Sequence, residues 1–205
     1  MRARAQGPAH RFKFEGLMVD YFQARCGEGV TQQHIKVDLE EIGLDPADFP
    51  SSVGRPHGGR FRVIIPDLLY PGIAMIECDG VGHYKPNSGW TGGDAEQAQD
   101  TFVRQRETDI IRRAYCAHHR LALVRVSNVR SADKPDLLCT EAEFYRRLRL
   151  ALSDLRAQLK AIRLATQRAR LQRARAIVQN LRNSLAQERQ RAVALPSQSE
   201  SPDDS

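Results

Sequence analysis

The stretch from Arg62 to His83, RVIIPDLLYPGIAMIECDGVGH, constrains the fold most, because two β-like runs in it flank a turn and carry acidic residues. The first run, Val63-Ile64-Ile65, is β-branched and favours a pleated strand. Tyr70-Pro71-Gly72 is typical of a turn, since proline presets φ and glycine permits a positive φ. In the second run, IAMIECDG, period-two alternation places Glu77 and Asp79 on one face. The sequence therefore predicts a hairpin that presents carboxylates along one edge.

Helices are expected on the N-terminal side of this hairpin. Apolar residues at three- and four-residue spacing predict a helix over residues 11–26. A second helix is expected over residues 31–42, with Thr31 as its N-cap and Gly43 at its end. Proline and glycine are frequent in residues 45–59, which indicates a loop.

After the hairpin we expect a loop, a helix and a strand. Trp90, in the loop over residues 81–93, either stacks on a base or covers the domain surface. Residues 94–117 predict a helix, and residues 121–126 predict a buried strand, so the order of elements indicates an α/β sandwich of modest size. The expected buried side of the helix contains Ala98, Phe102, Ile110, Ile111 and Ala114. Its charged residues Arg104, Arg106, Glu107, Asp109, Arg112 and Arg113 are expected to be mostly exposed.

The C-terminal third contains no glycine after Gly93, and no proline lies between Pro135 and Pro196. This composition predicts a basic long helix or a helical hairpin over residues 141–195. Apolar seams at coiled-coil spacing run along Leu148, Leu152, Leu155, Leu159 and Ile162, and along Leu171, Ala174, Val178, Leu181 and Leu185. Because the two seams are out of phase, we expect a kink, a stutter or a hairpin between Ile162 and Leu171.

The rest of the chain is expected to form an α/β domain over residues 11–140 and two disordered tails. The tail over residues 1–10 is basic, and the tail over residues 196–205 is acidic. The formal net charge of +6 favours an anionic partner, for which DNA is the leading candidate. The C-terminal arginines that we expect to bind nucleic acid are Arg163, Arg168, Arg170, Arg173 and Arg175. The alternative for this arm is self-association as a coiled coil in a homodimer, and both roles can hold at once.

Other sequence features bear on where in the cell the protein is located. No apolar run is long enough to span a membrane, and the N-terminus lacks the apolar core of a secretory signal. The four cysteines contain no CxxC pair, so a disulfide framework is not expected. We therefore expect a cytoplasmic protein, associated with the nucleoid if it is bacterial.

The acidic residues of the hairpin suit phosphodiester hydrolysis. This reaction needs a divalent cation to polarise the phosphoryl oxygen and to lower the pKa of the attacking water, and Mg²⁺ takes hard oxygen ligands. Asp67, at the end of the first run, and Glu77 would supply carboxylates, and the backbone carbonyl of Cys78 would complete the protein ligands. The expected cofactor is Mg²⁺, for which Mn²⁺ can substitute.

Further residues are candidates for catalytic support. Asp79 would bind a second ion or hold the water, and His83 suits proton transfer at neutral pH. Lys85 would place a positive charge beside the scissile phosphate. Glu15, on the first helix, is either a solvated charge or a contributor to the metal site.

These motifs occur in an order that resembles the restriction-endonuclease-like PD-(D/E)XK fold, a sandwich with a small central mixed sheet. Residues 60–127 are similar to the branch around very-short-patch repair endonucleases and their uncharacterised relatives. The matching motifs are Pro66-Asp67, Glu77-Cys78-Asp79-Gly80, His83, the arginine–acid pair Arg106-Glu107 on a helix, and Leu123-Val124-Arg125-Val126. The resemblance implies that Asp67 and Glu77 are metal ligands and that His83 activates the reaction or contacts the substrate phosphate. It also adds Arg106 as a supporting residue.

One residue departs from the family pattern. Asp79 stands at the usual position of the family's lysine, which leaves the general base unassigned. The leading hypothesis is a Mg²⁺-dependent endodeoxyribonuclease, with a role in DNA repair or restriction. The alternatives are a catalytically inactive nuclease-fold protein that binds nucleic acid, and a coiled-coil interaction protein with a structural α/β head.

Overall fold

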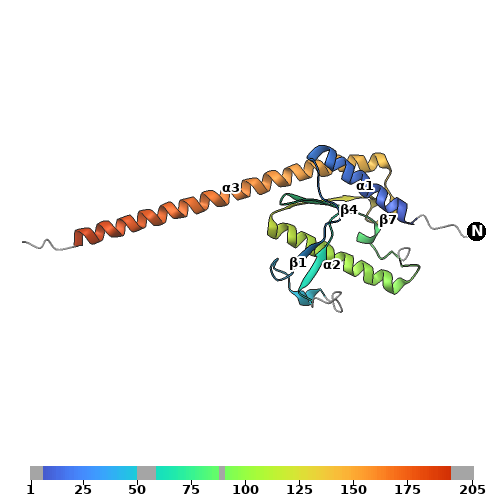
Figure 1. Cartoon of the computed structure of the whole chain (residues 1–205), viewed down its shortest axis with the longest axis horizontal. Helices are drawn as coiled ribbons and strands as arrows, with labels where there is room; N and C mark the ends of the chain where they lie inside the picture. The colour runs from blue at the N-terminus through green and yellow to red at the C-terminus, as the bar shows by residue number, and fades with distance from the viewer. Residues whose placement is uncertain (1–6, 50–58, 88–90, 195–205) are drawn as a thin grey trace, which may run out of the picture. The chain divides into compact units, whose positions relative to one another are not determined.

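The computed structural model describes residues 7–49, 59–87 and 91–194, which form an α/β protein (Figure 1). The chain divides into two units, residues 1–162 and residues 163–205. The helices are α1 (Gly7–Cys26), α2 (Ala95–His119) and α3 (Glu141–Ala194). The strands are β1 (Ile35–Asp38), β2 (Phe61–Ile64), β3 (Leu68–Tyr70), β4 (Ala74–Asp79), β5 (Ala122–Ser127), β6 (Val129–Ser131) and β7 (Lys134–Leu138). Two short 3₁₀ helices are η1 (Pro46–Asp48) and η3 (Val81–His83).

The central sheet is small and mixed, with the strand order β3-β4-β5. β3 and β4 form a tight hairpin around the predicted Tyr70-Pro71-Gly72 turn, in which Gly72 has a φ of +69° and the Ile73 N–H donates to the Tyr70 carbonyl at 2.9 Å. β4 pairs in parallel with β5, with Glu77 opposite Arg125 and Asp79 opposite Ser127. A parallel pair needs a crossover connection, and α2 supplies it. β4 is thus the middle strand and carries both acidic residues.

Apolar side chains cover both faces of this sheet. On one face, α1 and the first part of α3 pack on the strands, with Phe14, Phe144 and Ile76 in the same core cluster (Figure 1). On the other face, α2 and the β1-β2 pair enclose a second cluster that contains Met75 and Ile111. The alternation of Met75, Ile76 and their neighbours follows the period-two pattern expected for β4. The expected shared face for Glu77 and Asp79 is confirmed.

The helix expected over residues 31–42 is not formed, and this prediction is wrong. Residues 35–38 form β1, which pairs antiparallel with β2 so that Ile35 lies opposite Ile64. Val37 and Leu39 are buried while Lys36 is exposed, so burial alternates with the two-residue period of a β-strand. Val63 and Ile64 of the first run lie in β2 and pair with β1. The strand that pairs antiparallel with β4 is β3. The predicted pairing of the two runs was also wrong.

α2 begins where expected, because the Asp94 carboxylate accepts the Gln97 N–H at 2.9 Å as an N-cap. Its buried side differs from the prediction: Ala98 and Ile111 are buried, but Ile110 is 47% exposed. Glu107, Asp109 and Arg112 are buried or nearly so, although they were expected to be exposed. Their burial is tolerated where partners of opposite charge come from other elements.

α3 begins with a capping box, in which the Thr140 N–H donates to Glu143 Oε2 at 2.7 Å and the Glu143 N–H to Thr140 Oγ1 at 3.2 Å. Leu148, Leu152 and Leu155 of the first predicted seam pack in the core. The helix is continuous from Glu141 to Ala194, so the helical hairpin, one of the alternatives expected between Ile162 and Leu171, is not formed. The β6-β7 hairpin between β5 and α3 was not predicted.

Some expectations fall outside the described residues. These are the tail over residues 196–205, most of the tail over residues 1–10, much of the loop over residues 45–59, and Trp90. α1 begins at Gly7, so the last residues of the expected N-terminal tail are helical. None of the described helices combines the length and apolarity that crossing a bilayer requires.

Candidate functional site

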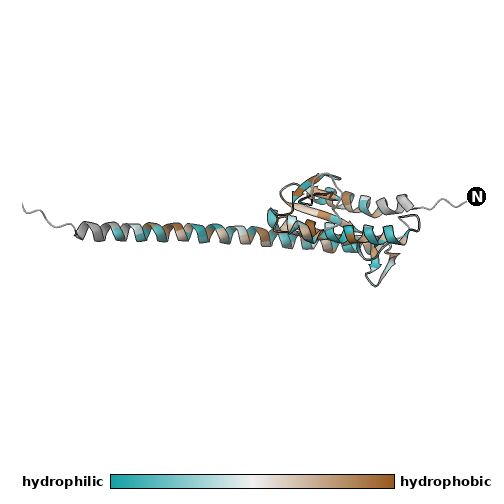
Figure 2. Ribbon diagram, turned by 90° about the horizontal axis from the view of Figure 1, so that it is seen from below, coloured by the Kyte–Doolittle hydropathy of each residue, from teal (hydrophilic) through white to brown (hydrophobic). Residues whose placement is uncertain are grey.

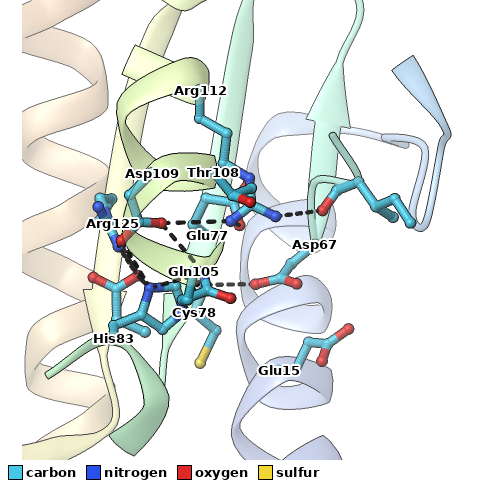
Figure 3. A network of polar contacts seen from close by, with 12 residues as sticks. Glu15, Asp67, Glu77, Cys78, His83, Gln105, Thr108, Asp109, Arg112 and Arg125 are labelled. Atoms are coloured by element: carbon cyan, nitrogen blue, oxygen red, sulfur yellow. Dashed lines mark hydrogen bonds and ion pairs between the residues drawn. The ribbon is translucent and has the colours of Figure 1, made fainter. Parts of the chain in front are cut away.

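A polar pocket of about 100 Å³ opens where β4, α1, α2 and the turn after β4 meet (Figure 3). It is lined by Glu15, Asp67, Glu77, Cys78, Gly80, His83, Gln105, Arg112 and Asn128. Five of the residues expected from the sequence to act together are among them: Glu15, Asp67, Glu77, Cys78 and His83. The strand-end carboxylates, the flanking helix and the following histidine therefore converge on one cavity.

Asp67 reaches the pocket from the connection between β2 and β3. The antiparallel register pairs Leu68 with Ile76, so continuing it by one residue brings Asp67 opposite Glu77, near the C-terminal end of β4. Asp67 Oδ2 accepts the Cys78 N–H at 2.7 Å. Burial raises the pKa of Asp67, and this hydrogen bond only partly opposes the shift. A buried carboxyl in this position favours a cationic neighbour.

Glu77 is the most deeply placed acidic residue of the pocket, with 3% of its surface exposed. Its Oε2 lies 3.2 Å from Arg112 Nη1, whereas Oε1 has no hydrogen-bond partner among the described residues. Burial raises the pKa of Glu77 well above its usual value; the Arg112 charge opposes this shift and the neighbouring Asp67 carboxylate adds to it. One buried carboxylate oxygen of Glu77 thus lacks a hydrogen-bond partner among the described residues.

Arg112 connects the two chain segments that carry these carboxylates. Its Nη2 donates to the Ile65 carbonyl at 2.7 Å, just ahead of Asp67, while Nη1 faces Glu77. Its Nε has no partner among the described residues. The guanidinium therefore places a positive charge beside both buried carboxylates.

A second charged network adjoins the pocket at His83 (Figure 3). Arg125 Nη2 lies 2.8 Å from both Asp79 Oδ1 and Asp109 Oδ2. His83 Nδ1 lies 3.1 Å from Asp109 Oδ2, and the Gln105 side-chain amide contacts the same ring. Burial would raise the pKa of Asp109, but the interactions with His83 and Arg125 lower it to about 2.

The remaining expected residues lie elsewhere. Asp79 is buried against Arg125 and does not line the pocket. Lys85 is half-buried beyond η3, outside the pocket lining, and Arg106 is exposed on α2. Sequence reasoning missed the pocket or network roles of Gln105, Asp109, Arg112 and Asn128, and gave Arg125 only as part of a strand motif. A signal for three of these existed: Gln105, Asp109 and Arg112 continue the three- and four-residue spacing of Ala98, Phe102 and Cys116.

The pocket's donor set fits a hard divalent cation. Within the described ranges, no group of three or more His, Cys, Asp or Glu side chains is arranged to hold a metal ion. Mg²⁺ needs only one or two carboxylates, because waters and substrate phosphates complete its octahedron. Asp67 and Glu77 meet this requirement, and the unpartnered Oε1 of Glu77 is an available oxygen ligand.

No protein-family model matches the chain, and no curated protein or solved structure matches it. The family resemblance of residues 60–127 therefore stays a prediction.

Proposed function

We propose that the chain is a metal-dependent endonuclease that hydrolyses phosphodiester bonds of DNA, with Mg²⁺ or Mn²⁺ held by Asp67 and Glu77. The observation that carries this proposal is the meeting of these two carboxylates in one polar pocket, where Glu77 Oε1 has no partner among the described residues. The backbone carbonyl of Cys78, the residue that hydrogen-bonds Asp67, is a candidate third ligand. A restriction-endonuclease-like fold is part of the proposal, supported by the mixed β3-β4-β5 sheet between helices.

Each residue of the pocket has a separate role in the proposed reaction. A bound divalent cation supplies Lewis acidity, which polarises the phosphoryl oxygen and makes the attacking water more acidic. Asp67 and Glu77 would hold that cation through their carboxylates. His83 contacts Asp109 through Nδ1, and its Nε2 lies 3.3 Å from the Gln105 amide nitrogen. Nε2, the ring nitrogen away from Asp109, would take up or deliver a proton. Glu15 lines the same pocket from α1, where its Oε1 accepts a hydrogen bond from the Gln32 side-chain amide at 3.0 Å, and it would orient a water.

The assignment of roles to Asp79 and Arg125 follows from their ion pair. Arg125 holds Asp79 through two donors, Nε at 3.0 Å and Nη2 at 2.8 Å. A carboxylate engaged in this way is a poor ligand for a second cation. We therefore assign Asp79 to positioning Arg125 and His83, and we retain a single cation in the proposal.

A second candidate function is DNA binding without cleavage. It is favoured by the same Asp79, since no lysine lines the pocket among the described residues and Arg125 neutralises the acid at the family's lysine position. Such a protein would bind DNA through charge alone, with an affinity that falls steeply as salt rises.

The experiment that separates these functions uses purified full-length protein with supercoiled, linear, mismatched and branched DNA. We expect cleavage of at least one substrate in Mg²⁺ and in Mn²⁺, and none in EDTA. Salt-sensitive binding to DNA with no nicking in either metal would reject the nuclease and support the second function.

A further inference from the structure

Hydrophobic residues recur between hydrophilic ones along the part of α3 that belongs to the C-terminal unit (Figure 2). The apolar stripe consists of Leu164, Leu171, Ala174, Val178 and Leu181. Leu164, Leu171 and Val178 recur every seven residues and are 44%, 60% and 48% exposed. Leu181, three residues after Val178, is 59% exposed, and Ala174 takes the equivalent position one heptad earlier. These residues occupy the two core positions of a heptad repeat, although they face solvent in the single chain.

Arginines border this apolar stripe on both sides. In the heptad that places Leu164 at the first core position, Arg168, Arg175 and Arg182 fall on one flank. Arg163 and Arg170 fall on the other flank. No aspartate or glutamate occurs over residues 163–187, so no acidic side chain of this segment can pair with them. Gln167 takes the second core position of the first heptad, and Ile177 and Ser184 continue the second flank. The stripe is therefore mainly apolar at its centre, and every charged residue on its edges is positive.

The charges argue against a second copy of this chain as the occupant. In a parallel pair, Arg163 would face Arg168 and Arg170 would face Arg175 of the second copy. In an antiparallel pair, each flank would meet the same flank of the other helix, which again opposes arginine to arginine. Like charges at these positions select against pairing.

A phosphate backbone would satisfy the arginines but not the leucines. Large apolar side chains on a helix face gain stability only when another apolar surface covers them. A partner helix with its own apolar seam and acidic flanks matches both features of this surface. A long helix with no tertiary packing also gains most of its stability from such a contact.

We propose that residues 163–184 of α3 dock an acidic amphipathic helix of a different protein in a heterodimeric coiled coil. Its apolar residues pack on Leu164, Leu171, Val178 and Leu181, and its carboxylates pair with the flanking arginines. The proposal is independent of the nuclease function. It gives the arm a protein partner in place of the DNA or homodimer partner expected from composition.

The test uses full-length protein and a four-heptad peptide with leucine at both core positions and glutamate on both flanks. A peptide of the same composition in scrambled order is its control, and binding is measured by calorimetry without DNA or metal. We expect the heptad peptide to bind and the scrambled peptide not to bind. The double variant Leu171→Ala/Leu181→Ala should weaken binding by about a hundredfold, because two buried leucine contacts are lost while alanine preserves the helix.

Matched variants test the specificity of the contact. Gln172→Ala/Asn183→Ala, on the outer face of the same helix, should bind like the wild type. Arg168→Glu/Arg175→Glu should weaken binding of the glutamate peptide and favour a peptide with lysine on the flank that faces residues 168 and 175 and glutamate on the other flank. Circular dichroism confirms that each variant keeps its helix.

Three results would overturn the proposal. The first is equal binding of the heptad and scrambled peptides, and the second is a peptide affinity that the leucine substitutions leave unchanged. The third is a wild-type dimer in sedimentation that Leu171→Ala/Leu181→Ala dissolves, which would make a second copy the occupant. If neither peptide binds but duplex DNA does, and only the arginine substitutions abolish that binding, nucleic acid is the partner instead.

Discussion

Arg112 Nη1 lies 3.2 Å from Glu77 Oε2, and each of the two side chains has one further polar atom without a partner among the described residues. This buried pair is therefore only partly satisfied. Arg112 also donates to the Ile65 carbonyl, so one guanidinium ties the segment before Asp67 to β4. The geometry of the pocket depends on this contact.

Replacing Arg112 tests that dependence. Arg112→Met removes the charge beside Glu77 and the hydrogen bond to Ile65, and it should lower the free energy of unfolding by about 3 kcal/mol, as for other broken buried pairs. Urea unfolding gives this value. In a Glu77→Gln background the same substitution should cost clearly less, because the charge it compensates is gone. Arg113→Met, at an exposed neighbour, is the control; equal losses for the two methionine variants would contradict the account.

Much of β4 and its surroundings was predictable because the signals are local. The alternation of Ile76, Glu77 and Asp79 gave the shared face of the two acids, and the apolar spacing of α1 gave its helix. β1 was missed because Thr31 and Gly43 resemble helix ends, whereas the alternation of Ile35, Val37 and Leu39 is the signal that decides. β2 pairs with that missed strand, so its partner was also wrong.

The buried charges of α2 were harder to predict. Asp109 and Arg112 lie at helical spacing from apolar residues, but a charged side chain is buried only where a partner stands opposite it. The partner of Asp109 is Arg125, which lies on β5 and is distant in sequence. Local sequence patterns do not show which distant residue pairs with Asp109. For this reason Asp109 and Arg112 were predicted to be exposed.

Asp109 should contribute to stability in a defined pH range. Its pKa is about 2 in the folded protein, below the ordinary value of 3.8, so its contribution is present above the ordinary value and is lost as pH falls towards the folded value. Asp109→Asn should therefore lower the free energy of unfolding by about 2 kcal/mol at neutral pH.

Urea unfolding at neutral pH and at several values between about 4 and 2 measures this contribution. The gap between the wild type and Asp109→Asn should close as the solution is acidified across that range. Asp100→Asn, at an exposed position of α2, should show no gap. A gap that widens on acidification would reject the role given to Asp109.

His83 should matter for the chemical step and not for DNA affinity. His83→Asn removes the ring nitrogen proposed for proton transfer, and the cleavage rate should fall on the order of a hundredfold to ten-thousandfold. Single-turnover cleavage and a DNA-binding titration separate the two effects. His118→Asn, an exposed histidine on α2, should cleave like the wild type. A loss of DNA binding equal to the loss of cleavage would assign His83 to binding.

The central claim, that Asp67 and Glu77 hold the catalytic cation, is tested most directly by plasmid nicking in Mg²⁺ with Asp67→Ala, Glu77→Ala and the exposed control Asp100→Ala. We predict that the wild type and the control nick the plasmid and that both pocket variants do not, while their DNA affinity stays equal or improves because carboxylates repel phosphate. Nicking that survives both Asp67→Ala and Glu77→Ala would contradict the account.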